Sequence, residues 1–163
     1  IGTANVVKVC SEFNLKLIYF STTYVYEGTK GNYKENEPVL PFNNYAWSKL
    51  GGEASVKLYK NSLILRICMT DYPFVHKKAI KGAKTSFIYN KFVAKIIPYI
   101  LNEKGVLNLG GNKRDIYGFA KKFENKSIKQ IIFKKVKNFP KDSSICIKKL
   151  KKIIKKNKIK LTL

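Results

Sequence analysis

Hydrophobic and polar positions alternate along the chain in a way that predicts helices and buried strands in turn. Apolar residues have helical spacing between residues 3 and 14, and Asn14 is the expected stop. Residues 17–20 are instead a continuous apolar run, typical of a strand covered on both faces of a parallel sheet, and residues 62–68 predict a second buried strand with one charge, Arg66. A helix followed by a buried strand is half of a βαβ unit, so the pattern predicts an α/β fold.

The helix expected after the first strand contains an unusual glycine pair. Asn43 or Asn44 is expected to cap it, and its pattern runs to about Lys60. Gly51 and Gly52 lie inside this helix, where each costs about 1 kcal/mol relative to alanine. The pair therefore predicts that another group closely approaches this part of the helix.

The later part of the chain repeats the alternation less regularly. Residues 70–88 follow neither the helical nor the strand period, and residues 128–137 fit a strand or a helix equally well. A final helix is predicted over 143–156, because its apolar residues form a stripe with lysines on the other face. The remaining elements expected are helices at 92–101 and 115–123 and a strand at 106–109.

The composition fits one domain with a substantial core, and it carries a large positive charge. The chain has 163 residues, 45% of them apolar, and a formal net charge of +23. Such a charge suggests nucleic acid or an anionic membrane, but 31 of the 33 basic residues are lysines, whereas phosphate and base recognition favours arginine. A genome biased toward AT-rich codons explains the lysines as well as a polyanion does. Nucleic acid is therefore not the favoured partner.

The sequence also disfavours membrane, metal and disulfide chemistry. No apolar run approaches the roughly 18 to 20 residues that a membrane span needs. The three cysteines, Cys10, Cys68 and Cys146, are far apart, and His76 is the single histidine. This pattern predicts reduced thiols in a cytoplasmic protein, with no zinc site.

Tyr45 and Lys49 carry the clearest candidate chemistry. Residues four apart lie one turn apart on the same face of a helix. A nearby ammonium favours the phenolate and lowers the pKa of the tyrosine toward neutrality, which suits a proton donor. A hydroxyl residue at the carboxyl end of the preceding strand would bind the substrate oxygen that the tyrosine protonates, since active sites of open α/β sheets lie at that end.

The spacing of this pair is weak evidence by itself. Two other tyrosines, at positions 26 and 117, also have a lysine four residues later, as expected by chance in so lysine-rich a chain. Only the pair at 45 and 49 follows both a buried strand and a long loop, residues 27–44. Loops of that length within compact domains are usually functional. The pair that begins at position 26 is interpreted as a chance spacing in a loop, and the pair that begins at position 117 as part of a solvated helix face.

Several segments together resemble a known family. Residues 20–28 read Phe-Ser-Thr-Thr-Tyr-Val-Tyr-Glu-Gly, and residues 45–53 read Tyr-Ala-Trp-Ser-Lys-Leu-Gly-Gly-Glu. With Leu-Ile-Leu-Arg at 63–66 and Val-Leu-Asn-Leu-Gly-Gly at 106–111, they closely resemble extended short-chain dehydrogenases, most of all dTDP-4-dehydrorhamnose reductase and related NAD-dependent nucleotide-sugar epimerases and reductases. The likeness is strong over 2–68, moderate over 86–123 and faint beyond.

The resemblance implies a fold, a reaction and a set of residues. It implies part of a Rossmann-type, doubly wound parallel sheet in one domain, with residues 1–69 as the second half of the Rossmann core and 70–163 as a small substrate-binding, helical region. The implied reaction is hydride transfer from NADPH or NADH to a 4-keto-6-deoxy nucleotide sugar. The implied site residues are Thr22, Tyr45 and Lys49 for catalysis, Ser21, Tyr45 and Lys49 for the cofactor, and Thr23, Tyr24 and Arg66 for the substrate.

One family feature does not occur in this sequence. No G-x-G-x-x-G turn is present to cradle the dinucleotide phosphates, and by the resemblance Ile1 falls near the middle of the Rossmann domain. The glycine-rich amino-terminal half is therefore expected to be missing, and a homo-oligomer or a complementing amino-terminal chain is the expected partner. Two alternatives stay open, a non-catalytic fragment and a basic module that binds a polyanion or a partner subunit.

Overall fold

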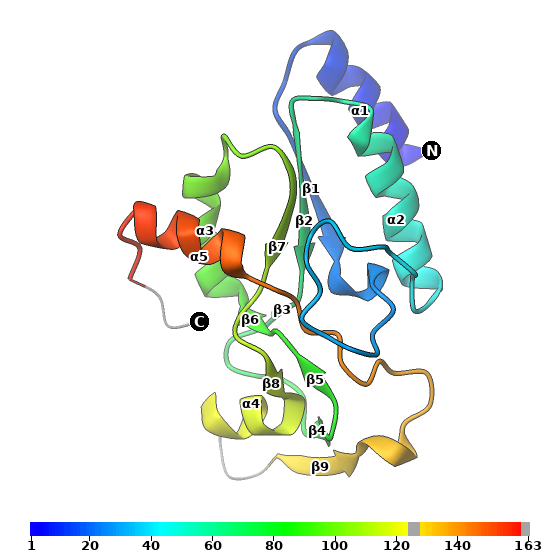
Figure 1. Cartoon of the computed structure of the whole chain (residues 1–163), viewed down its shortest axis with the longest axis vertical. Coiled ribbons are helices and arrows are strands. Elements are labelled where there is room, and N and C mark those ends of the chain that lie inside the picture. The colour runs from blue at the N-terminus through cyan, green and yellow to red at the C-terminus, as the bar shows by residue number, and fades with distance from the viewer. Residues whose placement is uncertain (124–127, 161–163) are drawn as a thin grey trace.

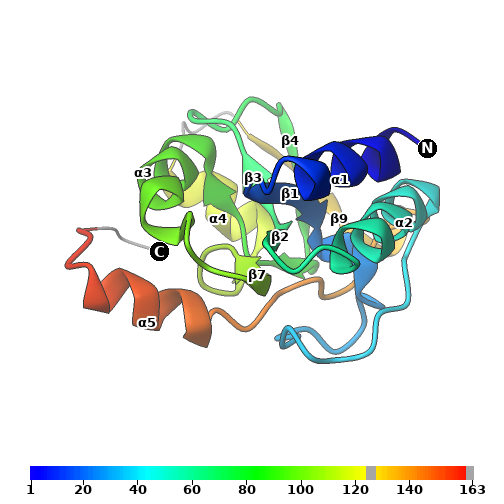
Figure 2. The ribbon, with the colours of Figure 1, turned by 90° about the horizontal axis from the view of Figure 1, so that it is seen from above.

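The centre of the molecule is a small parallel sheet between two layers of helices. The computed structural model describes residues 1–123 and 128–160. Helices α1 and α2 lie on one side of the sheet, and α3 and α5 lie on the other (Figure 1, Figure 2). The strands, in the order β1-β2-β7, are Leu17–Thr22, Ser62–Ile67 and Gly105–Leu109, and the helices are α1 Gly2–Glu12, α2 Asn44–Lys57, α3 Asn90–Ile100 and α5 Lys148–Lys156. The predicted α/β class with a parallel sheet is confirmed.

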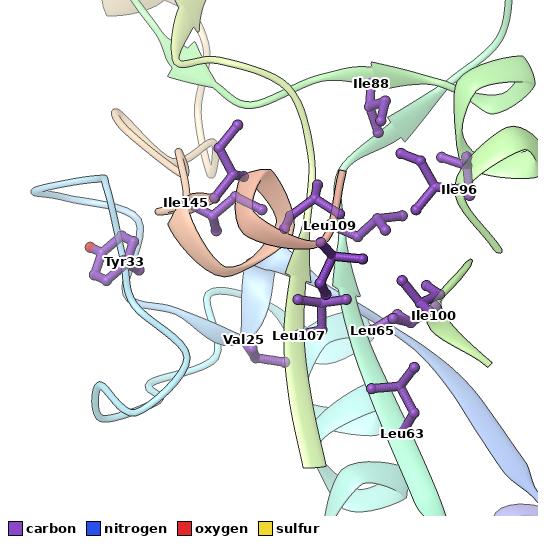
Figure 3. Close-up of a cluster of buried hydrophobic side chains, with 14 of the residues drawn as sticks. Val25, Tyr33, Leu63, Leu65, Ile88, Ile96, Ile100, Leu107, Leu109 and Ile145 are labelled. Atoms are coloured by element: carbon purple, nitrogen blue, oxygen red, sulfur yellow. The ribbon is translucent and has the colours of Figure 1, made fainter. Parts of the chain in front are cut away.

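The two faces of the sheet bury different side chains. Leu63 and Leu65 of β2 lie with leucines of β7 against isoleucines of α3, in the main apolar cluster (Figure 3). Ile64 points to the opposite face and packs with Val7 of α1 and Val56 of α2. Because successive side chains of a strand point to opposite faces, the apolar run at residues 63–65 covers both faces of β2. The prediction of a strand covered on both faces is confirmed for β2.

The same prediction is wrong for β1. Within the described residues β1 pairs only with β2, so it lies at the edge of the sheet. Its first three residues are half-buried, and the Phe20 side chain is 42% exposed. The apolar run therefore predicted the strand correctly, but it did not show whether the strand lies at the edge or in the middle of the sheet.

The end of α1 and the beginning of α2 follow their sequence signals. Helix α1 ends at Glu12, and Asn14 has a positive φ of 50°, a conformation that asparagine tolerates better than most residues. Helix α2 is capped by Asn43, whose Oδ1 accepts a hydrogen bond from the Ala46 N–H at 2.9 Å. Helix α2 ends at Lys57, three residues before the predicted end.

A second, smaller part of the fold is made of short strands around an aromatic cluster. It includes Phe74, Ile116 and Phe119 among its buried residues. Residues 70–88, which showed no periodicity, contain several of these strands, and 128–137 contains a strand followed by a 3-10 turn. The elements are β3 Met69–Thr70, β4 Lys78–Lys81, β5 Lys84–Thr85, β6 Ile88–Tyr89, β8 Arg114–Asp115, α4 Ile116–Phe123, β9 Lys129–Ile132 and the turn Phe133–Lys135, with pairs β3-β6, β4-β9 and β5-β8.

The last predicted helix begins later than expected. Residues 143–147 are not helical, because their backbone groups bond to distant segments: the N–H of Ile145 donates to Ser86 Oγ and that of Cys146 donates to the Tyr33 carbonyl. Helix α5 starts only at Lys148. The apolar stripe itself was identified correctly, since its five residues all belong to or pack against the main cluster: Ile145, Ile147, Leu150, Ile153 and Ile154.

Three predicted absences can be compared with the described part of the chain. No helix in residues 1–123 and 128–160 is long and apolar enough to span a membrane. The same residues contain no cluster of histidine, cysteine and acidic side chains suited to a metal ion. The three cysteines are buried and unpaired. Residues 124–127 and 161–163 of the predicted substrate-binding region lie outside the described residues.

Candidate active site

A pocket opens where β1 and β2 end. Its volume is about 360 Å³. It brings together six of the seven residues that the sequence predicted for the site, namely Ser21, Thr22, Thr23, Tyr24, Tyr45 and Lys49, and its other lining residues are Phe20, Ile67, Cys68, Met69 and Phe87. The position matches the expectation for an open α/β sheet, in which ligands bind at the carboxyl ends of the strands.

Thr22 is held at the last position of β1 by a turn that follows it. The backbone N–H of Tyr24 donates to Thr22 Oγ1 at 3.2 Å, so Thr22 caps the 3-10 turn Thr23–Val25. A hydroxyl has one proton and two lone pairs, and this bond uses one lone pair. The Thr22 proton therefore stays available to donate a hydrogen bond toward the pocket.

Tyr45 and Lys49 reach the pocket from the first two turns of α2. The Asn43 cap sets where this helix begins, and Ser48 Oγ donates to the Tyr45 carbonyl at 2.7 Å. The Tyr45 side chain is 55% exposed, whereas Lys49 is half-buried. Burial lowers the pKa of Lys49 below that of an ordinary lysine, and the negative charge of Glu53 opposes this effect.

Thr23 and Tyr24 form the pocket wall beyond Thr22. The Thr23 side chain is buried, and Tyr24 makes edge-to-face contacts with the rings of Phe42 and Phe139. Burial raises the pKa of Tyr24, so this phenol stays protonated at neutral pH. A second pocket, of about 320 Å³, adjoins the first and shares Tyr24 with it, together with Met69 and Phe87.

Arg66, the seventh predicted residue, does not line the pocket. Its side chain is 2% exposed, and its guanidinium donates to both carboxylate oxygens of Glu53, with Nη2 2.8 Å from Oε2. Nη1 also donates to the Tyr26 hydroxyl at 2.9 Å. The predicted contact between Arg66 and substrate therefore has no geometric support, because the resemblance located the strand but not the direction of this side chain.

Glu53 is the important residue that the sequence interpretation missed. It is fully buried on α2, one turn beyond Lys49, and its Oε1 also accepts a hydrogen bond from Ser21 Oγ at 2.6 Å. Ser21 thus directs its hydroxyl proton to Glu53. A lone arginine in an otherwise apolar strand could have revealed this carboxylate, since buried charges are almost always paired.

A polar row crosses the sheet at this level. Ser21 on β1 is in register with Arg66 on β2, and Arg66 is in register with Asn108 on β7. Tyr26 bridges the last two, because its hydroxyl receives the arginine bond and donates to Asn108 Oδ1 at 3.0 Å. The row therefore joins all three strands near their carboxyl ends, and its first member, Ser21, lines the pocket.

Gly52 accounts for part of the glycine pair in α2. A Cβ at position 52 would lie 2.1 Å from the hydroxyl oxygen of Tyr19, whereas a Cβ at position 51 would meet nothing within 4 Å. The predicted close approach is thus confirmed for Gly52, and the approaching group is Tyr19. Gly51 has no such neighbour.

This difference gives a matched pair of substitutions. Gly52→Ala is expected to lower the free energy of unfolding by about 1–3 kcal/mol, the usual cost of overpacking. Gly51→Ala is expected to raise it by up to about 1 kcal/mol, because alanine is the better helix former and the space is open. Urea unfolding of both variants measures the two values, and equal effects would contradict the assigned contact.

Comparison with known families finds a match for the first part of the chain. Residues 1–70 match the RmlD substrate binding domain. The RmlD region contains β1, the pocket residues of α2 and the whole of β2, so most of the candidate site lies within it.

Individual relatives agree with this result. The chain is 39% identical over 70 residues to the probable low-salt glycan biosynthesis reductase Agl14 of Haloferax volcanii. The aligned segment is 40% of this chain and 23% of that protein. A hypothetical dTDP-4-dehydrorhamnose reductase from Sulfolobus tokodaii superposes with a TM-score of 0.81 at 26% identity, over 93% of this chain and 63% of that one. The Bacillus anthracis dTDP-4-dehydrorhamnose reductase, in complex with NADP, superposes with a TM-score of 0.80 at 20% identity, over 99% of this chain and 66% of that one.

The similarity in sequence covers less of the chain than the similarity in fold. In sequence it covers the RmlD region, and in fold it covers nearly the whole chain, which has the architecture of the extended short-chain dehydrogenases. The chain spans about two thirds of the length of the two reductase structures and about a quarter of the Haloferax protein.

Proposed function

We propose that this chain carries the proton-transfer site of a nucleotide-sugar oxidoreductase that reduces a 4-keto-6-deoxy sugar with NADPH or NADH. The observation that carries the proposal is the pocket itself, where Tyr45 and Lys49 of α2 meet Thr22 at the end of β1. In this proposal residues 1–69 supply the reaction site, and residues 70–163 bind the rest of the nucleotide sugar. The family match over residues 1–70 supports the substrate class.

Each of the three residues has a distinct task in the proposed reaction. Thr22 donates a hydrogen bond to the substrate carbonyl oxygen, using the proton that its turn leaves available. Tyr45 gives its phenolic proton to the same oxygen as negative charge develops there, which is general acid catalysis. Lys49 provides a positive charge that favours the resulting phenolate.

The residues present fit one end of a nicotinamide cofactor. Tyr45 and Lys49 line the pocket with hydroxyl and ammonium groups suited to the ribose next to the nicotinamide ring. When bound, the cofactor supplies the hydride. The phosphates require a different element, because the chain contains no glycine-rich turn of the dinucleotide-binding type. We propose that a second polypeptide segment, in a complementing chain or an oligomer, completes this part and pairs with the exposed edge of β1.

The test uses the complete reading frame that encodes this chain. The purified protein is titrated with NADPH and with NADH, and turnover of a nucleotide-linked 4-keto-6-deoxy sugar is followed by the nicotinamide absorbance. Oxidation of the cofactor that depends on both the protein and the keto sugar is expected. Tight cofactor binding without reduction of any keto sugar would overturn the proposed reaction.

A further inference from the structure

Tyr19 touches the helix of the candidate site at two points. It is the third residue of β1, on the same face of the strand as Ser21, and that face is covered by α2. The Lys49 Nζ lies over the Tyr19 ring, 4.6 Å from its centroid. The Tyr19 hydroxyl donates to the backbone carbonyl of Lys49 at 3.2 Å. One side chain thus contacts both the ammonium and the backbone of the same residue.

The helix is shaped to admit this ring. Gly52 lies about one turn beyond Lys49, and any side chain at position 52 would collide with the Tyr19 hydroxyl. Ring and helix could not approach so closely with an alanine at this position. The helix therefore carries a glycine, with its cost in helix stability, at the point where Tyr19 crosses it.

Other charged groups near Lys49 are already engaged. Glu53 is the carboxylate next along this face of α2, but its oxygens accept bonds from Arg66 and Ser21. In the part of the chain that the structure describes, Lys49 Nζ has no hydrogen bond or ion pair, so its specific contact is the ring. An ammonium over an aromatic face is attracted by the ring quadrupole, and more strongly when it is partly desolvated.

We propose that Tyr19 is a positioning residue for the reaction, which holds the Lys49 ammonium at the mouth of the pocket through its ring. The ring fixes where the positive charge sits relative to Tyr45, and the hydroxyl fixes the backbone that carries it. The catalytic consequence rests on the proposed function, whereas the contact itself can be tested without turnover.

The test is an NMR titration of Lys49 in the full chain with 13C at the lysine Cε positions. The Lys49 signal is assigned by its loss in Lys49→Gln. Tyr19→Phe keeps the ring and should leave the pKa of Lys49 unchanged. Tyr19→Leu keeps an apolar cover but loses the attraction for the charged form, so the pKa should fall by about 0.4 to 1.5 units. The groups facing Lys49 are Glu53, Tyr45 and Tyr19, and only the last differs between these variants.

Two outcomes would overturn the proposal. One is the same Lys49 pKa in all three proteins, and the other is a pKa that rises in Tyr19→Leu, which would show that the ring only excluded water. If Tyr19→Leu does not fold, Gly52→Ala displaces the ring instead and should move the Lys49 signal while Gly51→Ala does not. Because no substrate is used, failure of this titration is distinguishable from failure of the proposed reaction.

Discussion

Tyr45→Phe is expected to lower turnover of the keto sugar by about 10²- to 10⁴-fold, the usual contribution of a general acid. The substitution removes the phenolic proton and leaves the ring, and Tyr45 lies on the surface of α2 with its side chain about half exposed. Neither the helix nor the pocket walls depend on its hydroxyl, since the helix is held by the Asn43 cap and by contacts farther along. Cofactor affinity should change little compared with turnover, because Lys49 remains in the pocket to bind the ribose.

Steady-state kinetics and cofactor titration of the complete reading frame measure the two effects. Tyr117→Phe is a matched control, because Tyr117 also has a lysine four residues later but lies on α4 in the aromatic cluster, outside the pocket. It should keep full turnover. Equal turnover of Tyr45→Phe and the unaltered protein would refute the assignment of Tyr45 as the acid.

Glu53→Leu is expected to lower the free energy of unfolding by about 3–5 kcal/mol, because it leaves the Arg66 guanidinium buried without its partner. Glu53 is fully buried and Arg66 is 2% exposed, so water cannot replace the lost contacts. Arg66→Met should lower the free energy of unfolding by a similar amount, because it leaves the Glu53 carboxylate buried without its partner. The double variant Glu53→Leu, Arg66→Met should recover much of the loss, since apolar pairs often replace buried ion pairs without penalty.

Urea unfolding of the three variants measures this coupling. The exposed pair of Lys8 and Glu12, 3.9 Å apart on α1, provides the control. Glu12→Gln should change stability little, as is usual for pairs in contact with solvent. Additive losses in the double variant would mean that Glu53 and Arg66 contribute independently and that the pair is not the unit of stability.

Much of the framework was predictable because its signals are local. The apolar run of β2, the Asn43 cap of α2 and the stripe on α5 are each visible in a short segment of sequence, without knowledge of what packs against it. The site residues Thr22, Tyr45 and Lys49 were brought into one pocket as expected, since a strand end and the helix that follows it are adjacent in such folds.

The features that escaped prediction depend on distant parts of the chain. Residues 143–147 follow helical spacing but bond to segments around Tyr33, Lys84 and Ser86, and those long-range bonds override the local preference. The family resemblance implied a substrate contact for Arg66, and nothing in its strand shows which face the side chain uses. Its partner Glu53 lies on a different element, and the pairing becomes visible only when α2 is laid on the sheet.

The polar row across the strands also bears on how the sheet finds its alignment. Successive side chains of a strand face opposite ways, so sliding β2 by one residue would turn Arg66 toward the leucines and isoleucines that pack against α3. A charge there would have no carboxylate, phenol or amide to meet it, and it would destabilise the slipped pairing strongly. The row therefore favours the observed register, in which Ser21 of β1 lies beside Arg66 of β2 and both bond to Glu53 of α2.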